Sequence, residues 1–465
     1  MTDTPWQGDA CSLVEAFRNG ERSPAEELDA TLAAVEASEL NCFSFLDPEG
    51  ARAKAARADV HKPFGGVPFG VKELSAYRGW PATEACTLFR DRVAEYTDTK
   101  LLRAEHDGGV VPFGMTTASE FGGLNVSVTK LNGVTHNPWR HGRTTGGSSA
   151  GSAGAVAGGL CTLASGGDGG GSIRIPAGFC GLPGMKGTAG RIPRGPHTWI
   201  HPMTVVSGVM ARSIRDIARF YDVCAGYDSR DPYSLPKIDT WEADLDSHRA
   251  DLRGRKVAVV PDLGVAVVAP AVAERVQQAG EELARAAELE VVDLDLRFPG
   301  LGFEWAIGNL SSLLAELGDL WPDGKAELTP EIAFGLELAE HEMSLAVMAR
   351  AETARTRANE TVAAAFDQVD FVICATNPDV AFPADVSLNT RVGDERVGPE
   401  NNGALTIPYN IVGNPSLSLP IGAVDGLPIG MQVATLHHRD AWLLDLGRIW
   451  EAEQPWPLMV PGAPG

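Results

Sequence analysis

The chain has 465 residues, of which 39 are Lys or Arg and 61 are Asp or Glu, giving a formal net charge of −22 at pH 7. Its 44% hydrophobic and 22% charged residues are typical of a globular protein with a large core. The acidic excess disfavours nucleic acid and anionic membranes as partners, and favours an uncharged or cationic small molecule.

The N-terminal segment, residues 10–60, predicts two helices. Ser23 precedes Pro24, which is a common helix start because serine caps free amides and proline fits the first helical position. Apolar residues then recur with helical spacing over residues 28–35. The alanine-rich segment 51–60 is the second predicted helix.

Two short apolar strands are predicted next. Residues 65–72, GGVPFGVK, combine a turn with a strand that ends at Lys72. Residues 101–106 predict a helix, and residues 109–114, GVVPFG, predict the second strand. Ligand sites of open α/β sheets gather at the carboxyl ends of strands, so Lys72 is a candidate site residue.

A glycine-rich stretch follows at residues 146–178. Small residues over 150–158 predict a closely packed helix, and residues 160–165, LCTLAS, predict a strand that ends in the loop GGDGGGS. The helix carries the chain away and the strand carries it back over about 15 Å. Ser148 and Ser172 are therefore expected at the same end of the sheet.

The second half of the chain alternates strands and helices. Strands are predicted at 256–260, 290–296, 371–374, 416–421 and 429–433, and helices at 270–289, 330–366 and 440–451. Thr329 is the expected cap of the 330–366 segment. The pattern predicts an α/β protein with one central mixed, largely parallel sheet, covered by helices on both faces and extended by helices over about 300–395.

The loop that leads into Ser172 suits acyl transfer. Glycines tolerate positive φ, and successive backbone N–H groups in such a loop bind an anion or a developing oxyanion. The stretch holds no histidine, so a Ser–Lys arrangement with Lys72 as base is the candidate chemistry. Such a lysine must be neutral, which burial favours. Asp168 and Arg174 are expected to brace the loop.

These segments resemble those of the amidase signature family. GVPFGVKEL, THNPWR, GGSSAGSAGAVAGG, GGDGGGSIRIPAGFCGLPGMKGTAGRIPR, TIPYNIVGNPSLSLPIG and GLPIGMQV occur in the family's order over nearly the whole chain. The resemblance implies the fold of that family and a single amidase domain. Its expected parts are N-terminal helices (about 1–65), a catalytic core (66–300), a helical, substrate-shaping elaboration (about 300–395) and a C-terminal return to the core (396–465).

The resemblance also implies roles for individual residues. Ser172 corresponds to the nucleophile, Ser148 to the bridging serine that follows a cis peptide bond, and Lys72 to the base. The backbone N–H groups expected to form the oxyanion hole are those of Gly169, Gly170, Gly171 and Ser172. No metal or cofactor is expected.

The implied activity is hydrolysis of an amide, anilide or carbamate C–N bond in a small uncharged substrate. The alternative is an A-type subunit of a tRNA-dependent amidotransferase, which works with partner proteins. A phosphate-binding module is a third hypothesis, disfavoured because the chain lacks GxxxxGK[ST]. Neither nucleic acid nor a membrane is expected as a partner, and a homodimer is left open.

Other assignments of the chemistry are weaker. Residues 147–151 match GxSxG with Ser149 at the centre, but that motif needs a preceding strand and later Asp and His partners. The residues before it are HGRTT, and the only late histidine pair is at 437–438. Cys180 lies among apolar residues and is expected to be a buried, inert thiol. Trp199, Trp305 and Trp321 are candidates either for lining a pocket or for packing.

The seven cysteines are scattered and form no CxxC motif. They are Cys11, Cys42, Cys86, Cys161, Cys180, Cys224 and Cys374. Their odd number and spacing disfavour a disulfide framework or a zinc ribbon and predict a cytoplasmic location. The first residues, MTDTPWQGDACSLVEAF, lack the pattern of a secretory signal.

Overall fold

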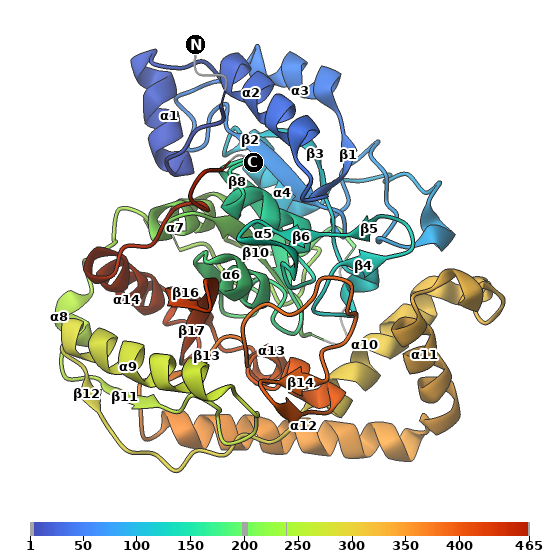
Figure 1. Ribbon diagram of the computed structural model, residues 1–465, viewed down its shortest axis with the longest axis vertical. Coiled ribbons are helices and arrows are strands. Elements are labelled where there is room, and N and C mark those ends of the chain that lie inside the picture. Colours follow the sequence, from blue (N-terminus) through green and yellow to red (C-terminus); the bar gives the residue numbers. More distant parts are fainter. Residues whose placement is uncertain (1–3, 198–202, 239, 464–465) are drawn as a thin grey trace.

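The computed structural model describes residues 4–197, 203–238 and 240–463. Helices surround two mixed β-sheets (Figure 1). The first sheet has the strand order β1 (Phe43–Leu46), β3 (Val111–Thr116), β2 (Pro68–Lys72), β8 (Leu163–Asp168) and β10 (Val206–Ala211). The second has the order β12 (Glu290–Val291), β11 (Lys256–Val259), β13 (Phe371–Ala375), β17 (Leu427–Thr435), β16 (Ser416–Val424) and β9 (Gly184–Lys186).

The predicted α/β class is confirmed, but the single, largely parallel sheet is wrong. The first sheet has parallel pairs β2–β3 and β2–β8 and antiparallel pairs β1–β3 and β8–β10. The second has parallel pairs β11–β12 and β11–β13, with β13–β17, β16–β17 and β9–β16 antiparallel. Strand β9 contacts β10 without joining its hydrogen-bond ladder, so the strands form two sheets that meet at this seam.

The N-terminal segment forms three helices where two were predicted. They are α1 (Ala10–Asn19), α2 (Pro24–Ala37) and α3 (Pro48–Ala55). Ser23 and Glu26 form a capping box at the start of α2, as the Ser-Pro pattern suggested. Helix α3 begins before the predicted 51–60 because the side chain of Asp47 accepts the amide of Gly50 and Pro48 takes the first helical position.

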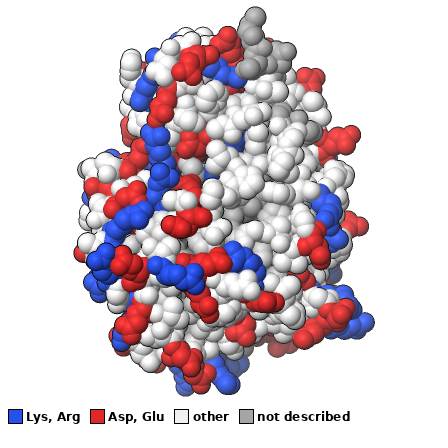
Figure 2. All heavy atoms as spheres, turned by 60° about the vertical axis from the view of Figure 1, so that its left-hand side comes forward, with Lys and Arg blue, Asp and Glu red and all other residues white. Residues whose placement is uncertain are grey.

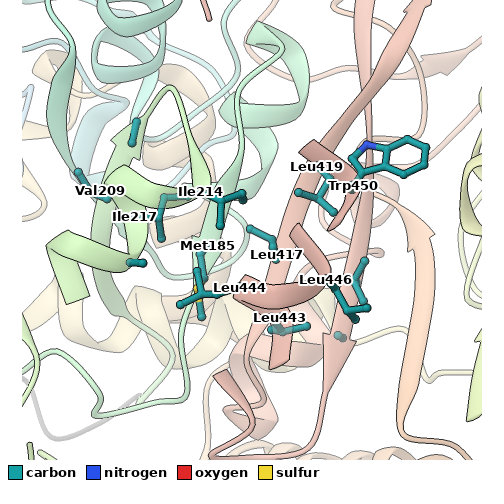
Figure 3. Close-up of a cluster of buried hydrophobic side chains, with 14 of the residues drawn as sticks. Met185, Val209, Ile214, Ile217, Leu417, Leu419, Leu443, Leu444, Leu446 and Trp450 are labelled. Carbon is teal, nitrogen blue, oxygen red and sulfur yellow. The ribbon is translucent and has the colours of Figure 1, made fainter. Parts of the chain in front are cut away.

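Helices α7 (Ile214–Cys224) and α14 (Asp440–Glu453) cover the seam between the sheets. Figure 3 shows the apolar side chains that fill it. They come from both sheets and both helices: Met185, Val209, Ile214, Ile217, Leu417, Leu419, Leu443, Leu444, Leu446 and Trp450. The indole of Trp450 donates a hydrogen bond to the carbonyl of Pro420 (2.8 Å), so its buried polar atom is satisfied.

Helix α9 (Pro270–Ala286) connects β11 to β12, and these two strands pair in parallel as predicted. The second strand is shorter than the predicted 290–296, because the chain leaves the sheet after Val291. Both of its residues are exposed, which is typical of an edge strand.

Three long helices form an arm beside the sheets, at the right and bottom of Figure 1. They are α10 (Gly302–Leu317), α11 (Pro330–Glu342) and α12 (Leu345–Phe366). The predicted side-chain cap by Thr329 is wrong: its hydroxyl and amide both donate to the carboxylate of Glu120, at 2.7 and 2.8 Å. The division of the chain into four functional parts stays a prediction.

The remaining elements are short. They are α4 (Thr99–His106), α5 (Ala150–Ala157), α6 (Arg174–Cys180), α8 (Arg249–Leu252), α13 (Ile407–Val412) and the hairpins β4 (Val128–Thr129) with β5 (Gly133–Val134), β6 (His136–Asn137) with β7 (Arg140–Thr144), and β14 (Arg391–Val392) with β15 (Glu395–Arg396). Within the described ranges no helix has the length and apolar character to cross a bilayer. On the face that Figure 2 presents, basic side chains lie among acidic ones rather than forming a separate field.

Candidate active site

The glycine-rich stretch folds as a helix that leaves the site and a strand that returns to it. Ser148 lies just before α5, and Ser172 lies in the loop after β8. Strand β8 is three residues later than predicted, because its glycines fit the ladder with β10, where Gly166 faces Gly208. The side chain of Ile173 fills the space beside both glycines.

Lys72, at the end of β2, lies against the segment just before α5 and against strand β8. Its Nζ is 2.8 Å from Ser148 Oγ, 2.9 Å from Ser149 Oγ and 3.2 Å from the carbonyl oxygen of Gly167. Its backbone amide donates to Ser165 Oγ at 2.7 Å, which fixes the end of the strand. A lysine and a serine that lie 76 residues apart in sequence therefore meet where the strand ends were expected to bring them.

The environment of Lys72 favours its neutral form. Burial and then the neighbouring Lys100 lower the pKa of Lys72 from 10.5 to about 7, against the opposing effects of Asp168 and Glu84. Burial also lowers the pKa of Lys100, and raises the pKa of Asp98, its ion-pair partner, to about 6. A base poised near neutral pH suits proton transfer.

Ser148 and Ser172 line the same cavity and are 3% and 8% exposed. The peptide bond between Gly147 and Ser148 is cis, as the family resemblance implied. The amide of Ser149 donates to the carbonyl of Ser172 at 3.2 Å, which ties the two loops together.

The loop over residues 168–172 is fixed by contacts to its peptide groups. The amide of Gly171 donates to Asp168 Oδ1 at 2.8 Å, so this amide is occupied and does not fit its predicted place in the oxyanion hole. The amides of Gly169, Gly170 and Ser172 make no hydrogen bond to another described residue. Three of the four predicted donors therefore stay open to a ligand.

Asp168 and Arg174 form a fully buried ion pair at 2.8 Å, which confirms the predicted bracing contact. Burial alone would raise the pKa of Asp168, but Arg174, with the amide of Asn410, holds it well below its ordinary 3.8. The guanidinium also donates to Asn410 Oδ1 (2.5 Å) and Gln432 Oε1 (2.6 Å). One network thus joins β8, α6, α13 and β17.

A cavity of about 1590 Å³ opens onto Lys72, Ser148 and Ser172. Its wall from the helical arm is mainly apolar: Phe303, Trp305, Leu310, Leu313, Ile332, Phe334 and Leu338. The part lined by Glu84, Asp98 and Lys100 is polar. The cavity therefore offers an apolar wall and a charged region in addition to the two serines.

The structure does not supply the partners that the alternative catalytic assignments need. No strand directly precedes Ser149, and the histidine pair of the elbow hypothesis instead contacts Val412 and Arg191. Cys180 is buried, and burial raises the pKa of its thiol. Trp305 lines the cavity, Trp321 donates to Glu340 away from it, and Trp199 lies outside the described residues.

In the described ranges one group has the composition of a metal site: Asp9, Cys11 and Asp216. The carboxylate of Asp216 accepts the amides of Ala10 and Cys11, at 3.1 and 2.9 Å. These oxygens therefore satisfy the free amides at the start of α1.

Sequence reasoning assigned no role to Lys100, Thr406 or Asn410. Thr406 and Asn410 belong to the TIPYN segment, which is one of the segments that resemble the amidase signature family. This resemblance was a signal that could have pointed to a role for both residues at the site. Lys100 carried no such signal, because a single lysine near the start of a helix is usually a solvated surface charge.

Comparisons with known proteins identify the family of the chain. The model of the family described as Amidase matches residues 26–444. One relative is the A subunit of a glutamyl-tRNA(Gln) amidotransferase from Roseiflexus sp. (strain RS-1), 30% identical over 97% of this chain and 97% of its own. Another is an acylamidase from Rhodococcus erythropolis, 29% identical over 96% of this chain and 95% of its own.

Solved structures give the same result. A bacterial aryl acylamidase of the amidase signature enzymes has a TM-score of 0.89 at 25% identity, covering 97% of each chain. A 6-aminohexanoate cyclic dimer hydrolase complexed with substrate has a TM-score of 0.86 at 26% identity, covering 98% of this chain and 99% of its own. The chain therefore belongs to the amidase signature family, whose members are amidohydrolases that act on amide C–N bonds.

Proposed function

We propose that this protein hydrolyses the C–N bond of an amide, anilide or carbamate through an acyl-enzyme on Ser172. In this proposal Ser148 relays the proton and Lys72 is the base. The observation that carries it is the 2.8 Å contact between a buried lysine amine and Ser148 Oγ, in a cavity that also exposes Ser172.

The contacts of Lys72 suit a neutral amine. A neutral amine has two N–H donors and one lone pair. The carbonyl of Gly167 and the hydroxyl of Ser149 can take the two N–H groups, at 3.2 and 2.9 Å. The lone pair is then directed to the hydroxyl of Ser148, which is the direction that proton abstraction requires.

The proposed reaction has two stages. Lys72 takes the proton of Ser148, Ser148 takes that of Ser172, and Ser172 Oγ attacks the carbonyl carbon while open amides of the glycine loop hold the oxyanion. The proton returns through Ser148 to the leaving nitrogen, and the C–N bond breaks. Water, deprotonated along the same route, then attacks the ester and releases the acid and Ser172.

The cavity favours a bulky, mainly apolar substrate. Ligand pockets commonly measure about 300–1,000 Å³, and this one, at about 1590 Å³, is larger and has an apolar wall from α10 and α11. Free glutamine, a small zwitterion, would leave most of it unfilled. We therefore favour an aryl or extended acyl amide over glutamine.

The test is a panel of aliphatic amides, anilides, carbamates and cyclic or oligomeric amides, scored by kcat/KM. Ser172→Ala is expected to lower kcat on the best substrate by roughly 10⁴-fold or more with the fold retained. Ser152→Ala is the matched control, because Ser152 lies in the same glycine-rich stretch and its hydroxyl bonds Thr116 on β3 and the carbonyl of Ser165. Normal turnover by Ser172→Ala contradicts the proposal.

The second candidate is one component of a tRNA-dependent amidotransferase, which the similarity to the A subunits of glutamyl-tRNA(Gln) amidotransferases supports. It predicts glutamine hydrolysis that appears only when partner proteins and charged tRNA are added. Hydrolysis of anilides by the protein alone, with no response to those additions, argues for the first candidate.

A further inference from the structure

Trp305 connects the helical arm to the loop that precedes Ser172. It lies on α10, is half-buried and lines the cavity. Its indole Nε1–H donates to the carbonyl of Gly169 at 2.7 Å. A Cβ placed on Gly170 would lie 3.0 Å from the same nitrogen, so the ring packs directly on this glycine.

The hydrogen bond from Trp305 orients the whole peptide group between Gly169 and Gly170. A peptide group is planar, and in a trans peptide the N–H points opposite to the C=O. The carbonyl of Gly169 shares its plane with the amide of Gly170, one of the three open donors of the loop. The indole therefore sets the direction of a donor that it does not touch.

Thr406 does the same for the next peptide group. Its hydroxyl donates to the carbonyl of Gly170 at 2.6 Å. That carbonyl shares its plane with the amide of Gly171, which donates to Asp168. Two successive peptide planes are thus held by two side chains that lie more than 130 residues further along the chain.

A run of glycines does not by itself fix the orientation of the loop amides. Without a Cβ, glycine populates many backbone conformations, and a run of three gives a loop whose amides point in many directions. Preorganised donors stabilise an oxyanion because they need not reorient during the reaction. A loop of this composition therefore needs external contacts to act as a fixed binding site.

We propose that Trp305 and Thr406 are positioning residues for the open amides of Gly170 and Ser172. Trp305 fixes the amide of Gly170 through the carbonyl of Gly169. Thr406 acts indirectly, because the carbonyl of Gly170 belongs to the peptide group that lies between the two peptide groups carrying these open amides. The inference rests on the proposed function, because it assumes that these amides receive the oxyanion. It assigns a residue of the helical arm, α10, to the reaction rather than only to the pocket wall.

The test compares variants that delete a donor and keep the bulk. Trp305→Phe removes the indole N–H, Thr406→Val removes the hydroxyl, and Thr406→Ser keeps it. The readouts are kcat and KM on the best anilide, and the calorimetric affinity for phenylboronic acid. In the boronate adduct Ser172 Oγ bonds to boron, the serine proton passes to Lys72, and the anionic tetrahedral centre mimics the transition state.

Trp305→Phe and Thr406→Val are each expected to lower kcat and weaken boronate binding by about tenfold, with KM changed less than about twofold. Thr406→Ser is expected to restore both values. A rise in KM at unchanged kcat, or boronate affinity within twofold of the parent, overturns the proposal. Trp321→Phe is the matched control, since its indole bonds Glu340 outside the cavity.

The two proposals fail separately. Boronate binding that is equally tight in Ser172→Ala contradicts Ser172 as nucleophile, and with it the proposed function. Binding that depends on Ser172 but not on Trp305 or Thr406 contradicts the positioning role alone. The calorimetric readout needs no turnover, so it decides the question even before the natural substrate is known.

Discussion

The buried position of Lys72 destabilises the charged, ammonium form of its side chain. It is 3% exposed, and its nearest contacts are two hydroxyls and a carbonyl rather than a carboxylate. Burial away from a neutralising carboxylate lowers the pKa of a lysine, because the ammonium form loses its hydration. The same position that destabilises the ammonium form therefore makes the amine available as a base at neutral pH.

The first prediction concerns the pH profile. A base works when deprotonated, so kcat/KM is expected to rise with pH through about 7, the pKa of Lys72. Lys100→Met removes a repelling cation, which raises the pKa of Lys72 and moves the rise to higher pH. Lys100→Arg keeps the charge and is expected to leave the profile nearer the parent. A profile that does not move in Lys100→Met contradicts this electrostatic coupling.

The second prediction concerns the buried pair of Asp168 and Arg174. Both side chains are fully buried, so removal of one charge leaves the other unpaired. Asp168→Asn is expected to lower the free energy of unfolding by about 3–5 kcal/mol, measured by denaturant titration. Glu288→Gln breaks the exposed pair with Arg253 and is expected to cost less than about 1 kcal/mol. Equal losses in the free energy of unfolding for the two variants contradict the expected difference between a buried and an exposed ion pair.

At the scale of elements, α5 shows why the stretch after Ser148 consists of small residues. Gly151 lies on this helix, and a Cβ there would overlap the carbonyl oxygen of Cys42 and lie 2.5 Å from the amide nitrogen of Thr117. These contacts are to backbone, which cannot rotate away. The helix therefore approaches its neighbours more closely than alanine permits.

The third prediction follows from that contact. Gly151→Ala is expected to lower the free energy of unfolding by more than about 1 kcal/mol, although alanine favours a helix over glycine by about 1 kcal/mol. Gly335→Ala on α11 is the control, since its Cβ would meet Leu310 at an ordinary 3.4 Å. That change is expected to be neutral or stabilising. Thermal denaturation of both variants checks the prediction, and a stabilised Gly151→Ala contradicts it.

The elements near the site were predictable because composition alone marks them. The strand that ends at Lys72 and the helix between the serines were found within two or three residues of their observed bounds. The start of β8 was missed because small residues fit a turn and a strand equally well, and pairing with β10 decides between them. The role of Thr329 was missed because its hydroxyl bonds Glu120, 209 residues away.

The candidate site was predictable in its centre and not in its surroundings. Lys72, Ser148 and Ser172 follow from strand ends and from the resemblance, and the structure brings all three to one cavity. The occupied amide of Gly171 and the contact from Trp305 depend on the orientation of single peptide groups. No pattern of residue types determines such orientations in a glycine loop.

At the scale of the whole molecule, the cysteines give the fourth prediction. All seven are free and buried, and burial raises the pKa of Cys42, Cys161 and Cys374 among them. The native protein is therefore expected to react negligibly with a thiol reagent such as dithionitrobenzoate over minutes. Seven thiols are expected to react after unfolding in guanidinium. Rapid reaction of more than one thiol in the native protein contradicts this burial.

The brace around Arg174 also has a consequence for how the protein is made. The guanidinium is held by Asn410 and Gln432, which are translated more than 230 residues after it. While the ribosome is still adding the middle of the chain, the loop beside Ser172 lacks the groups that order it. The loop beside Ser172 is therefore expected to become ordered only at the end of synthesis, and a chain that stops before position 432 is expected to lack part of this brace together with the end of β17.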